Sequence, residues 1–312
     1  FIRTKILNQN MTSRASSCSY ITLPKSSDYT YVLDFLVVNY PKISRQVWEK
    51  RIREGLVSDD CGNLINPFTP FMPGIRLKYF REVDAEPYVP FEEEIIYCNE
   101  HILVADKPHF LPVIPSGPYV NECLLGRLRR KTGNNNIVPV NRIDKETAGL
   151  VLFSVNPQTR GKYGLLFEKK RVCKIYEAVA KAPDKLCRRE WVMETRIEKA
   201  EPWFRSANVE GEPNAKSFIW LADINGEWGY FFIEPFTGKS HQVRLHMCAI
   251  GCPIKNDFLY PVLSPEPKKG YENPLQLVSR VLEFTDPVSN RKMRFVSQRK
   301  LTWPLNEDKK GK

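Results

Sequence analysis

The sequence predicts an α+β protein, in which a large domain built mainly of strands follows a small helical module. From residue 95 onward, short apolar segments typical of strands are separated by turns and by only a few helices. Strands and helices do not alternate regularly and no segment repeats, which argues against a parallel α/β fold and against a repeat architecture. At 312 residues the chain is long enough for one sizeable domain and a smaller one.

Composition and charge narrow the class of protein and its partners. Hydrophobic residues make up 42% of the chain, and no apolar run approaches the roughly 20 residues that a membrane-spanning helix needs. We therefore expect a cytoplasmic protein without a membrane span. Lys and Arg number 47 against 36 Asp and Glu, which gives a net charge of +11 and a pI near 9.2. This balance favours nucleic acid as the partner, although a basic surface without that role is the alternative.

The eight cysteines do not have the spacing of a metal site. They are scattered, none forms a Cys-x-x-Cys pair, and no histidine is placed to complete a zinc set. Free thiols of this kind suit a reducing compartment. We expect no metal.

Composition divides the chain into five segments. Residues 1–25, rich in Ser and Asn, are interpreted as a disordered leader or a leftover extension, and residues 306–312 as a charged tail. Between them we predict a small module over 26–83, a linker rich in proline and acidic residues over 84–94, and the large domain over 95–305.

Two short helices are expected in the small module. The first carries Val32, Phe35 and Leu36 on one face and ends at Pro41. The second begins after a Ser44 cap and ends near Gly55. Its apolar stripe and its cations are Val47, Trp48 and Ile52, and Arg45, Lys50, Arg51 and Arg53. With the strand-like segments behind them, the helices resemble the small αL RNA-binding module of a ribosomal protein, which implies that the four cations contact RNA. An ordinary packing appendage is the alternative.

Three strands and one helix are predicted around the polar loops of the large domain. The strands cover residues 102–105, 150–155 and 175–180. The helix is expected to begin after Asn156 with Pro157 at its first position, and to bury Tyr163, Leu166 and Phe167.

A polar loop between two apolar strands is the strongest candidate for chemistry. It reads Val-Asn-Arg-Ile-Asp-Lys-Glu-Thr-Ala-Gly-Leu over residues 140–150, and rigid strands on both sides would aim its side chains. An isolated Asp144 would more often be a turn residue. The segment, however, closely resembles the His-Arg-Leu-Asp-x-x-Thr-Ser-Gly-Leu signature of the RluA family of pseudouridine synthases, whose aspartate is catalytic.

Three further segments resemble the same family in the same order, over about residues 90 to 265. Residues 97–115 look like its opening strand and loop, and Lys174-Ile175-Tyr176 looks like its Lys-x-Tyr. Residues 235–254, followed by Asp257 and Tyr260, contain Thr-Gly-Lys-Ser-His-Gln-Val-Arg-Leu-His and resemble its Gly-Arg-Thr-His-Gln-Ile-Arg-x-His segment. Asn141 replaces the usual His and Lys239 the usual Arg, which bears on RNA contacts more than on the reaction.

The resemblance implies a mixed, largely antiparallel sheet with flanking helices, and an enzyme that isomerises uridine in ribosomal or transfer RNA to pseudouridine. The reaction breaks the bond from ribose to ring nitrogen and rejoins the base through a ring carbon, so it needs no cofactor, nucleotide or metal. Asp144 would either attack the sugar or base covalently, or remove a sugar proton to give a glycal; both routes stay open. We expect the protein to act as a monomer.

Arg244 and Tyr176 are the expected partners of Asp144. A helix capped by Ser240 would run to residue 250 and stop at Gly251, with Arg244 beside its apolar stripe. There a bidentate guanidinium would orient the Asp144 carboxylate. A phenol with a pKa of about 10 is protonated at neutral pH. Tyr176 is therefore expected to stack on the base or to hydrogen-bond, rather than to act as a permanent base.

Other polar residues of the matched segments are expected to contact RNA. They are Asn141, Arg142, Lys174, Lys239, His241 and Gln242. A base inside folded RNA must leave its stack before the carboxylate can reach the sugar. Arg142 is the expected wedge, with a phosphate contact as its alternative. His241 and His246 are five residues apart, unlike a zinc pair on one helix face, and are expected to pack or to contact RNA.

Two other functions compete with the enzyme. A catalytically silent RNA-binding or ribosome-assembly protein with the same fold would explain the changes at Asn141 and Lys239. A metal-dependent hydrolase would use Asp and His side chains, but the spacing of metal ligands is missing from the sequence.

Overall fold

The computed structural model describes residues 13–16, 18–41, 43–264 and 270–303. By its internal contacts the chain forms two units, one of residues 1–87 with 115–122 and one of residues 88–114 with 123–312. No helix in the described ranges is both long and apolar enough to cross a membrane.

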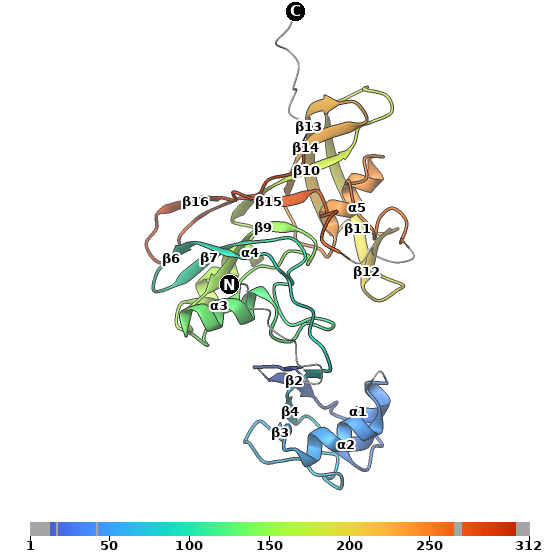
Figure 1. Ribbon diagram of the computed structural model, residues 1–312, viewed down its shortest axis with the longest axis vertical. Helices are drawn as coiled ribbons and strands as arrows, with labels where there is room; N and C mark the ends of the chain where they lie inside the picture. Colours follow the sequence, from blue (N-terminus) through green and yellow to red (C-terminus); the bar gives the residue numbers. More distant parts are fainter. Residues whose placement is uncertain (1–12, 17, 42, 265–269, 304–312) are drawn as a thin grey trace, which may run out of the picture. The chain divides into compact units, whose positions relative to one another are not determined.

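The first unit packs two helices against a small sheet (Figure 1). The helices are α1 (Val32–Asn39) and α2 (Arg45–Arg53). The sheet consists of antiparallel strands in the order β2 (Ser19–Thr22), β4 (Arg76–Tyr79) and β3 (Val57–Asp59), and a separate pair joins β1 (Ser13–Arg14) to β5 (Glu82–Val83). Trp48, Leu36 and Leu77 are completely buried in the core between helices and sheet.

The two predicted helices of this unit are confirmed. Helix α2 begins after Ser44, whose Oγ accepts the N–H of Val47 at 3.4 Å. Gly55 follows this helix with a φ of 69°, a left-handed conformation that glycine adopts without steric cost. The predicted apolar stripe is wrong at one position, because Val47 is 40% exposed while Trp48 and Ile52 are buried.

Two other predictions differ from the structure in this unit. Residues 19–22 of the predicted leader form β2, because Ile21 and Leu23 alternate toward the core; residues 1–12 and 17 lie outside the described residues. Arg51, predicted to contact RNA, is only 6% exposed. Its guanidinium lies over the ring of Trp48 and donates to the carbonyl oxygen of Glu82 at 3.4 Å, so Arg51 packs within the unit.

The two units divide after Pro87, inside the segment that we predicted as a linker. Residues 115–122, which we placed in the large domain, group with the first unit. The Glu86 carboxylate accounts for part of this grouping, because its Oε1 accepts the backbone N–H groups of Val120, Asn121 and Glu122 at 2.5 to 2.6 Å.

The second unit is built on one sheet, which has eleven strands among the described residues. They follow the order β12 (Arg205–Val209), β11 (Glu190–Ala200), β13 (Ala215–Asn225), β14 (Trp228–Pro235), β10 (Val172–Lys181), β15 (Leu277–Thr285), β9 (Ala148–Ser154), β7 (Ile102–Lys107) and β6 (Glu94–Cys98); β16 (Lys292–Val296) pairs with β15, and β8 (Val138–Pro139) with β9. Paired strands are antiparallel except β15 and β9. The predicted α+β fold with a mixed, largely antiparallel sheet is confirmed.

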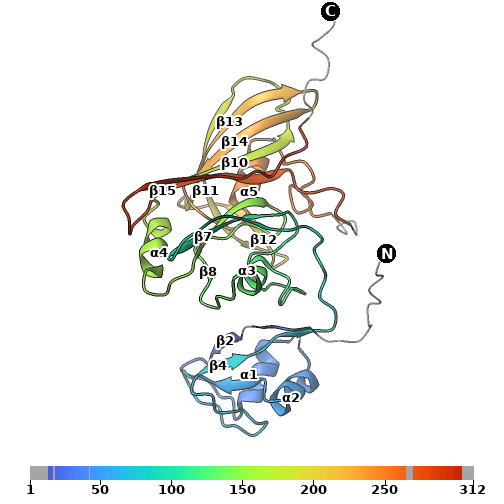
Figure 2. The ribbon, with the colours of Figure 1, turned by 60° about the vertical axis from the view of Figure 1, so that its left-hand side comes forward.

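Helices pack against this sheet in two separate cores (Figure 2). Helix α4 (Arg160–Glu168) buries Tyr163 and Leu166 against β7, β9 and β15. Helix α5 (Gln242–Ala249) buries Val243 and Met247 against β10, β13 and β14. The third helix is α3 (Leu124–Thr132). Helix α4 begins three residues later than predicted, because Asn156 Oδ1 accepts the N–H of Gln158 at 2.9 Å and holds a turn there.

The parallel pair joins the two halves of the sheet through an unusually close backbone contact. Ala148 lies opposite Val278, and Gly149 opposite Ser279. Gly149 has a φ of 110°, and a Cβ atom at this position would overlap the backbone of Ser279. Only glycine fits here, five residues after Asp144.

Candidate active site

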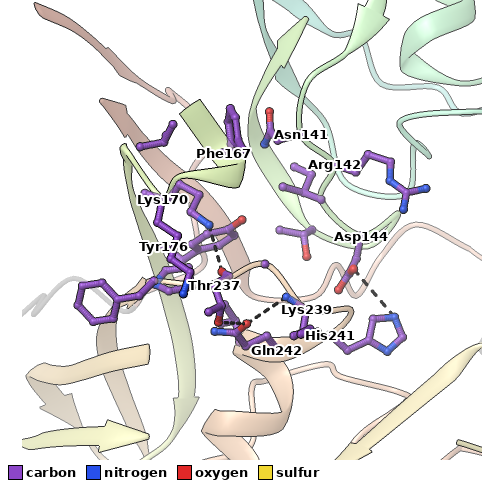
Figure 3. A pocket seen from close by; sticks show the side chains of 18 of the residues that line it. Asn141, Arg142, Asp144, Phe167, Lys170, Tyr176, Thr237, Lys239, His241 and Gln242 are labelled. Carbon is purple, nitrogen blue, oxygen red and sulfur yellow. Dashed lines mark hydrogen bonds and ion pairs between the residues drawn. The ribbon is translucent and has the colours of Figure 1, made fainter. Parts of the chain in front are cut away.

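A cavity of about 560 Å³ lies in the second unit, where the loop between β8 and β9 faces β10 and the segment ahead of α5 (Figure 3). Its lining includes residues from 140–147, from the end of α4, from β10 and from 235–244. The structure thus brings together the polar loop, the Lys-x-Tyr segment and the histidine- and arginine-containing segment that the sequence singled out.

Asp144 presents its carboxylate to this cavity. Its side chain is 27% exposed, with Oδ2 lying 3.4 Å from Nη1 of Arg244 and Oδ1 lying 4.0 Å from Nε2 of His241. The backbone carbonyl of Asp144 accepts the N–H of Thr147 at 3.1 Å, which closes the turn. One carboxylate is therefore held in a tight loop and remains accessible to a substrate.

Two side chains, of which Lys107 is fully buried, hold the Asp144 loop from behind. Lys107, at the end of β7, donates from Nζ to the carbonyl oxygens of Lys145 at 3.0 Å and Pro108 at 2.9 Å. His109 Nδ1 lies 2.7 Å from the carbonyl oxygen of Glu146, an atom that can only accept. Burial lowers the pKa of Lys107 to about 7 and that of His109 to about 4, although nearby acidic groups raise the pKa of Lys107. Both residues fix the position of the loop.

Arg244 binds a different carboxylate from the one that we predicted. Its Nε and Nη2 atoms donate to the two oxygens of Asp257 at 2.7 and 2.5 Å, and Asp144 receives one longer contact. Arg244 and Asp257 are both 1% exposed, so each needs the other as a counter-charge. Burial alone would lower the pKa of Arg244, but Asp257 and then Asp144 raise it. Arg244 is therefore a fixed cation beside Asp144 rather than its bidentate clamp.

Tyr176 lines the cavity from β10, where it pairs with Ile233 of β14. Burial, with a smaller contribution from the charge of Asp144, raises the pKa of Tyr176 to about 12. The phenol is consequently protonated at neutral pH and can stack or donate a hydrogen bond.

Two residues that line the cavity adopt the left-handed backbone conformation, which residues other than glycine rarely take. They are Lys170, with a φ of 53°, and His241, with a φ of 57°. His241 precedes α5, where no side chain caps the helix, so the predicted Ser240 cap is wrong. Its Nδ1 lies 2.8 Å from the hydroxyl of Tyr260, and burial lowers its pKa. Backbone strain of this kind persists where the surrounding packing enforces it.

Gln242 and Lys174 shape the segment ahead of α5. Gln242 is buried, accepts from Thr237 Oγ1 at 2.7 Å and from the N–H of Lys239 at 3.1 Å, and donates to the carbonyl of Lys216 at 2.9 Å. Lys174 donates from Nζ to the carbonyl of Thr237 at 3.1 Å, and burial lowers its pKa. The amide of Gln242 is thereby committed inside the protein, while the side chain of Lys239 is exposed at the cavity.

The remaining predicted residues differ in their surroundings. Asn141 Oδ1 accepts the N–H of Leu152 at 2.8 Å and ties the loop to β9, whereas Arg142 is exposed at the cavity. His246 is buried, with its ring nitrogens 2.9 Å from Ser217 Oγ and 3.0 Å from Thr195 Oγ1, so it packs inside. The α2 cations belong to the other unit. No group of three metal-ligating side chains occurs in the described ranges.

Sequence reasoning gave no role to Asp257, Lys107 or His109. Lys107 and His109 lie inside one of the segments that resembled the family, and Asp257 follows another, thirteen residues after Arg244. The need for a counter-charge to bury Arg244 beside an apolar stripe is the signal that could have found Asp257.

Comparisons with known proteins agree with this geometry. A profile of the RNA pseudouridylate synthase family matches residues 101–249, the range that holds Asp144, Tyr176 and Arg244. An RNA pseudouridine synthase of Synechocystis sp. is 28% identical over 232 residues, which cover 73% of this chain and 79% of that protein. The dual-specificity RNA pseudouridine synthase RluA of Haemophilus influenzae is 28% identical over 226 residues, covering 67% and 93%.

By these matches the chain is similar to the RluA-type RNA pseudouridine synthases. A solved structure of the same fold, human RNA pseudouridylate synthase domain containing 1, superposes with a TM-score of 0.56 at 17% identity, covering 69% of this chain and 86% of that chain. Members of this synthase family are isomerases of RNA, so the cavity is a candidate active site for that reaction.

Proposed function

We propose that this protein isomerises specific uridines of ribosomal or transfer RNA to pseudouridine, with Asp144 as the catalytic carboxylate. The observation that carries the proposal is the position of Asp144 in the cavity. Its carboxylate lines the same cavity as the ring of Tyr176, while the fork of Arg244 is occupied by Asp257. Asp144 therefore has free lone pairs for a sugar or a base.

Each neighbour has a distinct part in this proposal. Arg244 holds one oxygen of Asp144 and offsets the cost of covering that charge with a base. The protonated phenol of Tyr176 stacks on the uracil or donates a hydrogen bond to it. Arg142, exposed at the cavity, is the candidate to fill the gap that the flipped base leaves in the RNA stack. The carboxylate attacks covalently or removes a sugar proton, and the geometry is compatible with both routes.

Replacing the carboxylate by an amide tests the proposal directly. Asp144→Asn keeps the shape of the side chain but removes the nucleophile and base, so we expect turnover to fall by at least about 1000-fold. RNA affinity should change by less than about 3-fold, because few contacts are lost. Pseudouridine formation and RNA binding are both measured. Substantial turnover by this variant would contradict the assignment. If turnover and RNA binding are both lost, Asp144 is needed for the structure of the site.

Chemical mapping of pseudouridine across total RNA, with and without the gene, would identify the substrate. One missing site names the target uridine and decides between ribosomal and transfer RNA. If no site is lost and the purified protein still binds RNA, the protein is the catalytically silent RNA-binding alternative. Activity after exhaustive EDTA treatment, with RNA folding controlled, separates the isomerase from a metal-dependent hydrolase.

The other parts of the proposal concern assembly, location and the first unit. We propose that the protein acts as a monomer, which light scattering of the full chain tests. A cytoplasmic location stays a prediction, to be checked by imaging the full chain. The exposed cations of α2 are proposed as an auxiliary RNA contact that supplies affinity and no chemistry.

A further inference from the structure

A second cavity, of about 460 Å³, adjoins the candidate active site. The two cavities share the lining residues Lys170, Val172, Pro235 and Phe236, so they adjoin near the end of α4 and of β14. The second cavity extends away from Asp144 toward the hairpin of β15 and β16, where Lys292 lines it. Of its lining residues, Pro235 and Phe236 alone belong to the four segments that resembled the family.

The lining of the second cavity combines three kinds of group that a nucleotide requires. Lys170, Arg171 and Lys292 are exposed, and none of them forms an ion pair with any residue that the structure describes. Phe236 is 41% exposed and offers a ring at the junction with the active site. Glu234 also lines the cavity and can accept hydrogen bonds from a base.

The two carboxylates of this lining do not cancel the positive charge. Glu283 is paired with Arg294 at 3.4 Å, which leaves Glu234 as one carboxylate beside three cations; Glu234 also accepts from the thiol of Cys173 at 3.7 Å. This lining fits a nucleotide better than a simple anion or an acidic peptide, because it combines three cations for phosphates, an exposed ring and a carboxylate acceptor.

The backbone of Lys170 supplies a second, independent observation. Helix α4 ends in a Schellman motif, in which the N–H of Lys170 donates to the carbonyl of Phe167 at 3.1 Å and that of Arg171 to the carbonyl of Leu166 at 2.7 Å. The residue at the left-handed position of this motif is usually glycine, because a side chain is strained there. A lysine stands at this position with a φ of 53°, and its side chain lines both cavities.

We propose that the second cavity binds the nucleotide next to the target uridine, with its base stacked on Phe236 and its phosphates beside Lys170, Arg171 and Lys292. The inference rests on the proposed function for the identity of the RNA, but its tests measure binding as well as turnover. The subsite would position the strand as it leaves the active site, and would make turnover depend on the residue flanking the uridine.

Charge at the subsite is tested with two matched pairs of substitutions in the full chain. Arg171→Gln with Lys292→Gln removes two cations that line the cavity, while Lys169→Gln with Arg291→Gln removes two exposed cations from the same two segments that do not line it. The probe is a fluorescein-labelled single-stranded RNA of about 15 nucleotides with one central uridine, and anisotropy is measured over a range of salt. The first pair should flatten the slope of log affinity against log salt by about 1.4, and the control pair by much less.

Stacking on Phe236 is tested by combining protein and RNA changes. Phe236→Ala should weaken binding of the probe by roughly 5- to 100-fold, whereas Phe236→Trp should retain it. An abasic residue on one side of the uridine should weaken binding to the wild type by a similar factor and to Phe236→Ala hardly at all. Equal losses in both proteins at every abasic position would overturn the stacking contact.

Lys170→Gly separates a binding role from a structural one. Relief of the left-handed strain should raise the melting temperature, while loss of the cation should weaken binding of the probe about 3- to 10-fold. A variant that binds as the wild type does would overturn the role of Lys170. Equal salt slopes for the two charge pairs would overturn the subsite even if turnover is normal. If the substitutions weaken binding as expected but the wild type forms no pseudouridine, the subsite stands and the proposed function is rejected.

Discussion

Helices α2 and α5 each withdraw an arginine from solvent, but the two arginines have opposite surroundings. Arg244 on α5 has both oxygens of Asp257 within 2.7 Å and one oxygen of Asp144 at 3.4 Å. Arg51 on α2 has the ring of Trp48 and one carbonyl oxygen at 3.4 Å. Accordingly, the acidic partners raise the pKa of Arg244, whereas burial lowers that of Arg51. Of these two buried arginines, the one with carboxylate partners lies at the candidate site, and the one without them packs in the core of the first unit.

Replacing each arginine by methionine is the strongest test of this difference. Arg244→Met leaves two carboxylates without their cation, and removing one partner of a buried pair costs about 3 to 5 kcal/mol. Arg51→Met removes a cation without a carboxylate partner and should change stability by less than about 1 kcal/mol. Calorimetry of both variants measures the effect, and each arginine serves as the control for the other. Similar losses would break the comparison.

Substitutions of Tyr176 test whether its ring or its hydroxyl contributes to turnover. Tyr176→Leu should reduce kcat/KM by about 5- to 100-fold, because base stacking on an aromatic ring contributes about 1 to 3 kcal/mol. Tyr176→Phe keeps the ring and should stay within about 10-fold of the wild type, less than general acid–base catalysis contributes. A loss in Tyr176→Phe as large as in Tyr176→Leu would mean that the hydroxyl, rather than stacking, matters.

Lys107 extends the comparison to a buried cation that touches only carbonyl oxygens. Its folded-state pKa of about 7 lies below the ordinary value of about 10.4, so above pH 7 the unfolded chain binds the proton that the folded chain lacks. The free energy of unfolding should therefore rise with pH, by about 2 kcal/mol between pH 7 and pH 9. Lys107→Met should abolish that rise in urea titrations. If wild type and variant show the same pH dependence, Lys107 is charged in the folded protein.

The exposed cations of α2 should have the smallest effect. Arg45 is paired with Asp34 and Glu49, and Lys50 lies 3.9 Å from Glu54, so part of their charge is already balanced. Replacing Arg45, Lys50 and Arg53 by glutamine should flatten the salt slope of RNA binding by about 0.7 to 1.4, with kcat unchanged. Asp34→Asn releases Arg45 and should strengthen binding slightly. An unchanged slope would make α2 a packing element, and a collapsed kcat would mean that it helps form the active site.

The sequence predicted which segments meet at the cavity but not which atoms pair there. Asp144, Tyr176 and Arg244 came from residue types and spacing in a continuous motif, and they line one cavity. The fork of Arg244 was assigned to the wrong aspartate, because charge pairing depends on which groups are buried together. Arg51 was misplaced for the same reason, since a cation beside an apolar stripe has the same pattern whether it faces solvent or a tryptophan.

Local signals were also overridden where the chain builds the site. Ser44 caps α2 as its type predicts, but Ser240 does not cap α5, because His241 takes a left-handed conformation and Gln242 turns its amide inward. Helix propensity and capping describe isolated segments. At the cavity, contacts with Tyr260 and Lys216 decide the backbone, and no pattern within the segment encodes them.

The close contact at Gly149 makes the relative position of Asp144 and Tyr176, the two groups proposed to act on the substrate, depend on the absence of a side chain. Asp144 lies in the loop just before β9, Tyr176 belongs to β10, and β15 lies between those two strands. Any side chain at position 149 would act as a wedge driven between β9 and β15, and would change the gap that the substrate must bridge. Position 149 should therefore tolerate substitution poorly, although Gly149 itself has no side chain that could take part in the reaction. A substitution there should displace Asp144 relative to Tyr176 while leaving both side chains present.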